Sequence, residues 1–286
     1  MSYIDLHTHT TASDGTDTPS KLVLNAVDKK LSAIAITDHD TVSGISEALE
    51  ASRELPIEVI SGIELSCLYN DKDLHMLGYF VDYTNQTFLD KLEELKKKRE
   101  FRNEQMRQKL EEHGIVLTME QIQGQAKQSV ITRAHFAKAM EEAGYIKSKE
   151  EAFLKYIGDG CPCFVQKLRF TPQEAIDLIH SAGGVAVLAH PLIYKMSYDE
   201  IDLLLKYLKE CGLTGVEVYH SSHNISNSGK LREMIRPYHL LPTGGSDYHG
   251  SNKQNVQLGC GYGGMAISHS LLDDLKQAHS RLRNFS

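Results

Sequence analysis

Residues 3–15 read YIDLHTHTTASDG, with two histidines one residue apart at the end of a short apolar strand pattern. Alternate side chains of a β-strand point to the same side, so the imidazoles of His7 and His9 project together. Asp14 follows in a polar turn, five residues after His9. The stretch therefore predicts a strand that ends in a metal-binding pair, followed by a carboxylate that can serve a neighbouring ion.

Strand and helix patterns alternate along the chain after this stretch, which is typical of a parallel α/β fold. Residues 18–31 are expected to form a helix capped by Thr18, because Pro19 fits the first turn and apolar residues follow at helical spacing. Further strands are expected at 32–40, 57–67, 73–81, 185–191, 213–223 and 240–250. Helices are expected between them at 43–55, 171–184, 198–212 and 229–239, and a last one from about residue 268.

The pattern changes between residues 83 and 165. A long, highly charged amphipathic helix is expected first, and shorter helical stretches follow it. The charge run KLEELKKKRE is typical of a solvated helix face. We expect residues 83–165 to form a helical insertion that packs over the core and caps the active site.

Composition excludes several classes of protein. The 286 residues carry a formal net charge of -7, so a phosphorylated ligand would need a local site rather than a basic surface. No segment resembles a signal peptide, and no apolar run approaches the roughly 18 residues of a membrane span. Five scattered cysteines argue against a disulfide framework and favour the cytoplasm, with a metal-binding role for Cys161 and Cys163 as a minor alternative.

Histidines and acids recur where the predicted strands end. Because the carboxyl ends of parallel strands form the active-site face of such folds, these side chains are expected to converge. A mixture of imidazoles and carboxylates suits two or three divalent ions, with Mn, Fe and Zn all acceptable. The residues concerned are His7, His9, Asp38, His39, Asp40, Glu64, His75, His190, His220, Asp247 and His249.

Six stretches resemble, in order, the motifs of the PHP (polymerase and histidinol phosphatase) family of metal-dependent phosphoesterases. They are DLHTHTTASDGT, AIAITDHDT, GIELS, HMLGY, VAVLAHP and GGSDYHG. The resemblance implies a distorted (β/α)7 TIM-like barrel, with residues 1–82 and 166–286 as the PHP barrel domain. It is closest to a subgroup with a helical insertion that acts on nucleoside 3′,5′-bisphosphates or short RNA 5′ ends.

The resemblance also implies a ligand set, position by position. His7, His9, Glu64 and Asp247 would bind a first metal ion, and Asp14, His39 and His249 a second. Glu64, His75 and His190 would hold a third, with Glu64 as a bridge. Asp38 and Asp40 are interpreted as acids that orient histidine ligands. Asp40, His190, His220 and His223 are the candidates for acid–base work in catalysis.

Phosphate binding needs positive charge beside the metals. Arg133 and His135 resemble the family's phosphate-contacting R-x-H, and an arginine can hold a phosphate with two hydrogen bonds. The alternative is a surface helix with a salt bridge. Lys167 and Arg169, where the chain returns to the barrel, are weaker candidates.

The predicted function is hydrolysis of a phosphate ester by a metal-bridging hydroxide. The expected substrate is the 3′-phosphate of a nucleoside 3′,5′-bisphosphate, with short oligoribonucleotides as a further partner. The same chemistry on phosphoribosyl 1,2-cyclic phosphate or histidinol phosphate is the first alternative. A catalytically inert metal-binding PHP module and hydrolysis of a C–N bond are the others. The sequence leaves the metal identity and the oligomeric state open.

Overall fold

The structure is a computed structural model that describes residues 2–124, 131–166 and 169–285. It contains two compact units, Met1–Lys91 with Arg169–Ser286, and Leu92–Leu168. The sequence patterns put the boundaries after residues 82 and 165 instead. The observed boundary between Lys91 and Leu92 lies inside a helix, α3 (Gln86–Glu112). The sequence of this helix has no turn signal at that point, so the pattern could not place the boundary there.

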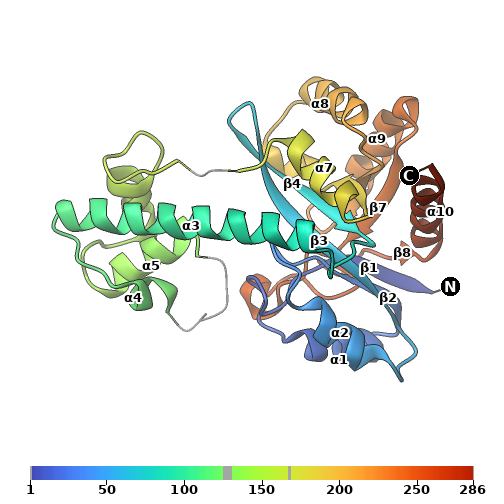
Figure 1. Cartoon of the computed structure of the whole chain (residues 1–286), viewed down its shortest axis with the longest axis horizontal. Coiled ribbons are helices and arrows are strands. Elements are labelled where there is room, and N and C mark those ends of the chain that lie inside the picture. The colour runs from blue at the N-terminus through green and yellow to red at the C-terminus, as the bar shows by residue number, and fades with distance from the viewer. Residues whose placement is uncertain (1, 125–130, 167–168, 286) are drawn as a thin grey trace. The chain divides into compact units, whose positions relative to one another are not determined.

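The first unit is built on one eight-stranded sheet in the order β7-β6-β5-β4-β3-β2-β1-β8. Figure 1 labels most of these strands among the surrounding helices. The sheet curls until its two sides meet, where the Asp247 N–H donates to the His7 carbonyl at 2.9 Å and Thr8 pairs with Tyr248. The expected TIM-like barrel is therefore confirmed. The strands are β1 (Tyr3–Thr8), β2 (Leu31–Ile36), β3 (Glu58–Tyr69), β4 (Lys72–Tyr79), β5 (Val185–Leu188), β6 (Gly215–His220), β7 (Leu241–Gly245) and the short β8 (Ile267–Ser268).

One expectation was wrong: β4 runs antiparallel to both of its neighbours, β3 and β5. The reason is a two-residue hairpin turn at Asn70 and Asp71, whose φ values are 47° and 61°. The reversal has a consequence for the site. It brings an early residue of β4, His75, to the same edge as the carboxyl ends of β3 and β5, where its carbonyl accepts a hydrogen bond from the Ala189 N–H.

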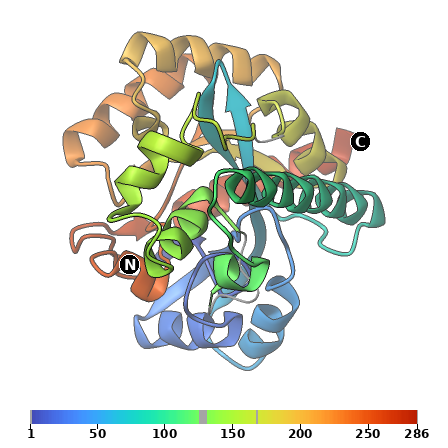
Figure 2. The same ribbon diagram turned by 90° about the vertical axis from the view of Figure 1, so that its left-hand side faces the viewer.

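Helices cover the outside of this sheet. Thr18 caps α1 as predicted, since its hydroxyl oxygen accepts a hydrogen bond from the Lys21 N–H. Both views show α1 beside α2 (Figures 1 and 2). The helices of this unit are α1 (Pro19–Asp28), α2 (Ile45–Ser52), α7 (Pro172–Ser181), α8 (Tyr198–Glu210), α9 (Ile225–Ile235) and α10 (Ser270–Phe285), with short 3₁₀ turns at Pro191–Tyr194, Arg236–Tyr238 and Gly250–Lys253.

The interior of the barrel is apolar below the strand ends. Ile4 and Leu6 of β1 pack with residues of the other strands, and Leu272 and Leu275 of α10 belong to the same buried cluster. Aliphatic packing therefore fills the barrel at the start of its parallel strands and leaves polar side chains at the opposite edge.

The second unit has a helical core of its own. It combines α3 from Leu92 on with α4 (Met119–Gln123), α5 (Arg133–Glu142), α6 (Lys149–Ala152) and a π-helical turn (Phe153–Ile157). Cys163 is buried in this core, and none of the candidate metal-ligand groups among the described residues contains a cysteine. None of the described helices, the charged α3 included, has the length and apolar character of a membrane span.

Candidate metal centre

Glu64, at the centre of the strand ends, is surrounded by imidazoles. Its carboxylate is fully buried, and nitrogens of five histidines approach its two oxygens. The distances are 3.3 Å for His7, 3.2 Å for His9, 3.1 Å for His39, 2.9 Å for His75 and 3.0 Å for His190. These residues come from or follow β1, β2, β4 and β5, so the barrel brings together side chains that are far apart in the sequence.

Two further carboxylates lie beside this cluster. Asp247, which follows β7, lies 3.4 Å from both His9 and His249 and 3.6 Å from His7. Asp14 lies 3.2 Å from His249, 3.6 Å from His9 and 3.9 Å from His39. All nine predicted metal ligands are therefore close together at one edge of the barrel.

The donor set fits divalent cations. Several buried atoms lack a hydrogen-bond partner among the described residues although they face one another: Nε2 of His7, both ring nitrogens of His9, Nδ1 of His39 and Oε2 of Glu64. Unsatisfied buried nitrogens and oxygens are unfavourable unless a cation or water binds them. Imidazole nitrogens with carboxylate oxygens are the ligands that Mn, Fe and Zn accept.

The structure groups these ligand atoms differently from the three ligand sets that the family resemblance implies. Four groups have atoms close enough for one ion: His9–Asp14–His39–His249, His7–Glu64–His190, His39–Glu64–His75 and His7–His220–Asp247. His9 thus joins the Asp14 group. His220 lies close enough to His7 and Asp247 to share an ion with them, but the Ser222 N–H donates to its Nδ1 at 3.1 Å. A neutral His220 then carries its proton on Nε2, the nitrogen that faces Asp247, and this favours hydrogen-bond donation over metal binding.

Protonation of the metal-free cluster follows from burial and mutual charge. Burial opposes protonation of His9, but Asp247 and Glu64 outweigh it and raise its pKa to about 9. Burial lowers the pKa of His39 and of His190 to about 4. Burial alone would raise the pKa of Glu64, yet the surrounding histidines hold that pKa well below its usual value. The carboxylates are therefore ionised and ready to bind cations.

Three residues of the site or its surroundings have a backbone with positive φ. Asp40, His190 and Asp247 have φ values of 53°, 24° and 57°, a region that non-glycine residues seldom adopt. Such conformations concentrate at functional sites, where surrounding structure holds them in place. Here they turn the chain sharply just after strands end.

Comparison with known proteins agrees with this geometry. A model of the PHP domain matches residues 5–214. The chain belongs to the PHP family. It is 35% identical over 247 residues to the 5′-3′ exoribonuclease Rnm of Escherichia coli K12, which covers 86% of this chain and 84% of the relative. A 3′,5′-nucleoside bisphosphate phosphatase of Chromobacterium violaceum is 30% identical over 260 residues, or 91% of each chain.

A solved structure has the same fold. It is an amidohydrolase from Chromobacterium violaceum with bound sulfate and no metal, and it matches this chain with a TM-score of 0.76 and 29% identity over 90% of both chains. Another solved structure, of a metal-dependent phosphoesterase from Bifidobacterium adolescentis, matches with a TM-score of 0.78 and 29% identity over 96% of this chain and 95% of that one. This PHP protein is a metal-dependent phosphoesterase, which confirms the expectation of an enzyme.

The acids predicted to orient histidines have other partners. Asp38 accepts hydrogen bonds from Thr10 and Ser13, and so holds the loop between His9 and Asp14 instead of an imidazole. The carboxylate of Asp40 accepts from the N–H and the hydroxyl of Ser66. Both acids position backbone near the PHP site.

The candidate phosphate-binding residues are divided between the two units. In the barrel unit Arg169 forms an ion pair with Asp73, and its buried Nε lacks a hydrogen-bond partner in the described part of the chain. In the helical unit Arg133 pairs with Asp159 at 2.7 Å, and His135 lies in the capping box that begins α5. Lys167 lies outside the described residues.

Two charged residues at the PHP site were not predicted. Glu217 of β6 is fully buried, lies 2.9 Å from Nδ1 of His7 and accepts from the His190 N–H at 2.8 Å. Lys253 lies 2.5 Å from Asp247. An acid inside the buried strand pattern GVEVYH is the signal that indicates Glu217. Lys253 has no comparable signal, because it follows the last motif in a short turn.

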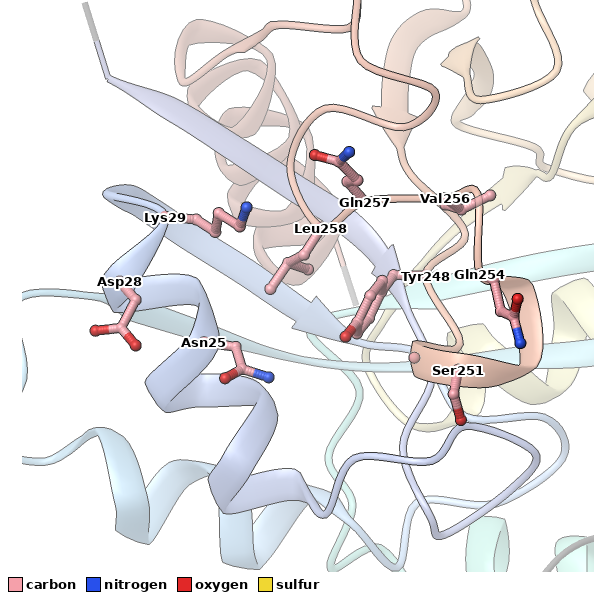
Figure 3. A pocket seen from close by; sticks show the side chains of 10 residues that line it. Asn25, Asp28, Lys29, Tyr248, Ser251, Gln254, Val256, Gln257 and Leu258 are labelled. Carbon is pink, nitrogen blue, oxygen red and sulfur yellow. The ribbon is translucent and has the colours of Figure 1, made fainter.

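A separate cavity of about 480 Å³ lies between α1 and the loop after β7 (Figure 3). Its lining includes Asn25, Lys29, Tyr248 and Gln257, and contains none of the predicted site residues. The hydroxyl of Tyr248 donates to Asp17, while the neighbouring Asp247 and His249 belong to the metal cluster. The cavity is thus distinct from the candidate metal centre.

Proposed function

We propose that this protein hydrolyses the phosphoester on the 3′-oxygen of nucleoside 3′,5′-bisphosphates, and that the 5′ ends of short RNAs are substrates of the same site. The observation that carries the proposal is the buried cluster of imidazole and carboxylate atoms that have no hydrogen-bond partners in the described part of the chain. The printed names of two relatives, an exoribonuclease and a bisphosphate phosphatase, support the substrate class. Both kinds of substrate have a phosphorus on the 3′-oxygen of a terminal nucleotide.

The cluster provides a strong anionic binding site for divalent ions. Such ions, when bound, polarise phosphoryl oxygens and lower the pKa of bound water to near neutrality. His7, His9 and Glu64 are fully buried, so bulk water is excluded from their side of the centre. With the fold holding these ligands in place, little reorganisation is needed when substrate binds.

His220 is our candidate for donating a hydrogen bond to the leaving 3′-oxygen. Its Nδ1 accepts from the Ser222 N–H, which leaves its proton on Nε2 beside Asp247 at 3.3 Å. His223 is less suited to this role. Its Nδ1 donates to the Val218 carbonyl at 3.0 Å, so the lone pair of the neutral ring is on Nε2. Burial lowers the pKa of His223. His223 therefore accepts protons poorly and donates none from Nε2 near neutral pH.

Arginines are our candidates for recognising the phosphates. Burial lowers the pKa of Arg169, which Asp40 opposes, so the guanidinium stays charged in a partly dry environment. A charged guanidinium there binds phosphate more strongly than it does in water. Arg133 is the second candidate, by its resemblance to the family's R-x-H.

The test is phosphate or nucleotide release after metal stripping and reconstitution with manganese. The panel contains adenosine 3′,5′-bisphosphate, a short 5′-phosphorylated RNA, histidinol phosphate and phosphoribosyl 1,2-cyclic phosphate. We expect the highest kcat/KM for the bisphosphate and measurable release of mononucleotide from the RNA. A preference for the cyclic or the histidinol ester would keep the metal chemistry and overturn the proposed substrate.

A further inference from the structure

Glu217 connects two candidate metal ligands from different strands. One carboxylate oxygen lies 2.9 Å from Nδ1 of His7, which is in β1, and the other accepts from the backbone N–H of His190, which follows β5. Glu217 reaches them because β6 has a bulge at Val218: Glu217 pairs with Thr243, but Tyr219 pairs with the next residue, Gly244. Glu217 and His220, an odd number of residues apart, can then both face the site.

At one of the two carboxylate oxygens of Glu217, the contact with His190 fixes which group donates the hydrogen bond and which accepts it. A backbone N–H can only donate, so the oxygen facing His190 must accept. The ionised carboxylate also accepts with its second oxygen, so His7 must donate from Nδ1. In the neutral imidazole of His7 the lone pair is then on Nε2, which lies 3.3 Å from Glu64 and 3.6 Å from Asp247 and has no hydrogen-bond partner among the residues that the structure describes.

We infer that Glu217 is a positioning residue that fixes the tautomer and orientation of His7, so that Nε2 presents a lone pair to a metal ion. The carboxylate acts through His7 and does not itself touch substrate. The inference rests on metal dependence alone and is independent of which phosphate ester is hydrolysed.

The test exploits the difference between glutamine and aspartate at this position. In Glu217→Gln the shape is kept, and the amide oxygen must face the His190 N–H. The amide NH₂ then faces Nδ1 of His7 and forces the proton onto Nε2, where it blocks metal binding. In Glu217→Asp the side chain is shorter, but both oxygens still accept. Glu58→Gln is the matched control, since Glu58 lies in β3 and pairs with Lys276.

Zinc affinity is measured by competition with a chelator, and the imidazole ¹⁵N spectrum is recorded for histidine-labelled, zinc-loaded protein. We expect Glu217→Gln to lose affinity for one ion by about 100-fold, at the upper end of such effects. Glu217→Asp should lose less, and Glu58→Gln nothing. One zinc-bound imidazole with a protonated Nδ1 should be missing from the Glu217→Gln spectrum only.

A role in packing alone predicts the opposite order, with Glu217→Asp the weaker binder, and that order would overturn the inference. Unchanged zinc affinity in Glu217→Gln would do the same. Thermal unfolding of the metal-free variants checks the fold. Glu217→Gln is expected to fold, because its amide oxygen still accepts from His190, and failure to fold would also contradict the inference.

Discussion

Asp247 shows how one side chain joins several parts of the candidate centre. It lies within 3.6 Å of His7, His9 and His249, and it also contacts His220 and Lys253. We expect Asp247→Ala to bind metal poorly and to lower kcat by about 1,000-fold, since metal ions supply several kcal/mol of transition-state stabilisation. Steady-state kinetics with metal analysis tests this. Asp273→Ala, an exposed change in α10, is the control, and near-normal turnover of Asp247→Ala would remove Asp247 from the mechanism.

The buried histidines also predict how stability depends on pH when metal is removed. The pKa of His9 is about 9 in the folded, metal-free protein, above about 6.5 in the unfolded chain. Its contribution to stability is complete below pH 6.5 and is lost as the pH rises through 9. His39 and His190, with pKa values of about 4, contribute stability above pH 6.5 that is lost as the pH falls.

The metal-free protein should therefore be most stable near pH 6.5, and His9 should account for roughly 3 kcal/mol of loss on the alkaline side. Zinc should remove that alkaline loss, because a metal-bound imidazole carries no proton on its ligand nitrogen. Thermal unfolding between pH 4 and 10, with chelator or with zinc, measures both effects. An alkaline loss of equal size in the zinc-loaded protein would contradict the explanation.

Sequence could predict which residues converge but not how their protons are arranged. His7, His9, Glu64 and Asp247 stand where predicted strands end, and the order of strands in a barrel brings such ends together. Glu217 was missed because strict alternation puts it and His220 on opposite faces. Only the bulge at Val218, a property of strand register, brings both to the site.

At the scale of elements, the closure between β1 and β7 depends on a glycine. A Cβ at Gly245 would overlap the Cβ and the backbone N of His7. We expect Gly245→Ala to lower the free energy of unfolding by about 1–3 kcal/mol or more, through overpacking. The variant should also weaken metal binding, because His7 is the residue displaced.

Gly229→Ala is the matched control, since Gly229 lies in α9 and a Cβ there meets no atom. Alanine in a helix interior should raise stability by roughly 0.5–1 kcal/mol. Denaturant unfolding of both variants measures the difference. A Gly245→Ala protein as stable as wild type would show that β1 and β7 can separate without loss.

The direction of β4 shows that the pattern of apolar residues in a sequence can predict a strand without predicting which way it runs in the sheet. Apolar runs predicted a strand at 73–81, but the same runs fit either direction. The turn residues Asn70 and Asp71 decide it. Their positive φ values suit a tight hairpin, and a two-residue connection is too short for a crossover helix. His75 could be assigned to the site from its motif, whereas its position in the first half of an antiparallel strand required the structure.

At the scale of the whole molecule, the open question is whether Arg133 of the helical unit binds the phosphate of the substrate. Arg133 is one-quarter exposed, pairs with Asp159 and lies over the rings of Phe153 and Phe164. The same contacts fit two roles, a phosphate-binding arginine held ready by aromatic rings or a salt bridge that stabilises the unit. Sequence cannot separate these roles, because both keep an arginine at the start of α5.

Substitutions on either side of the ion pair can separate them. If Arg133 binds phosphate, Arg133→Ala should raise KM for adenosine 3′,5′-bisphosphate by roughly 10- to 100-fold, the effect of losing a hydrogen bond to a charged group. Asp159→Ala should leave KM unchanged or lower it, since it releases the guanidinium from its partner. Lys138→Ala, an exposed change on the same helix, should have no effect. If Asp159→Ala instead reproduces the kinetic defect and both variants unfold at lower temperature, the arginine stabilises the helical unit, and phosphate recognition must come from the barrel, with Arg169 as the residue to test next.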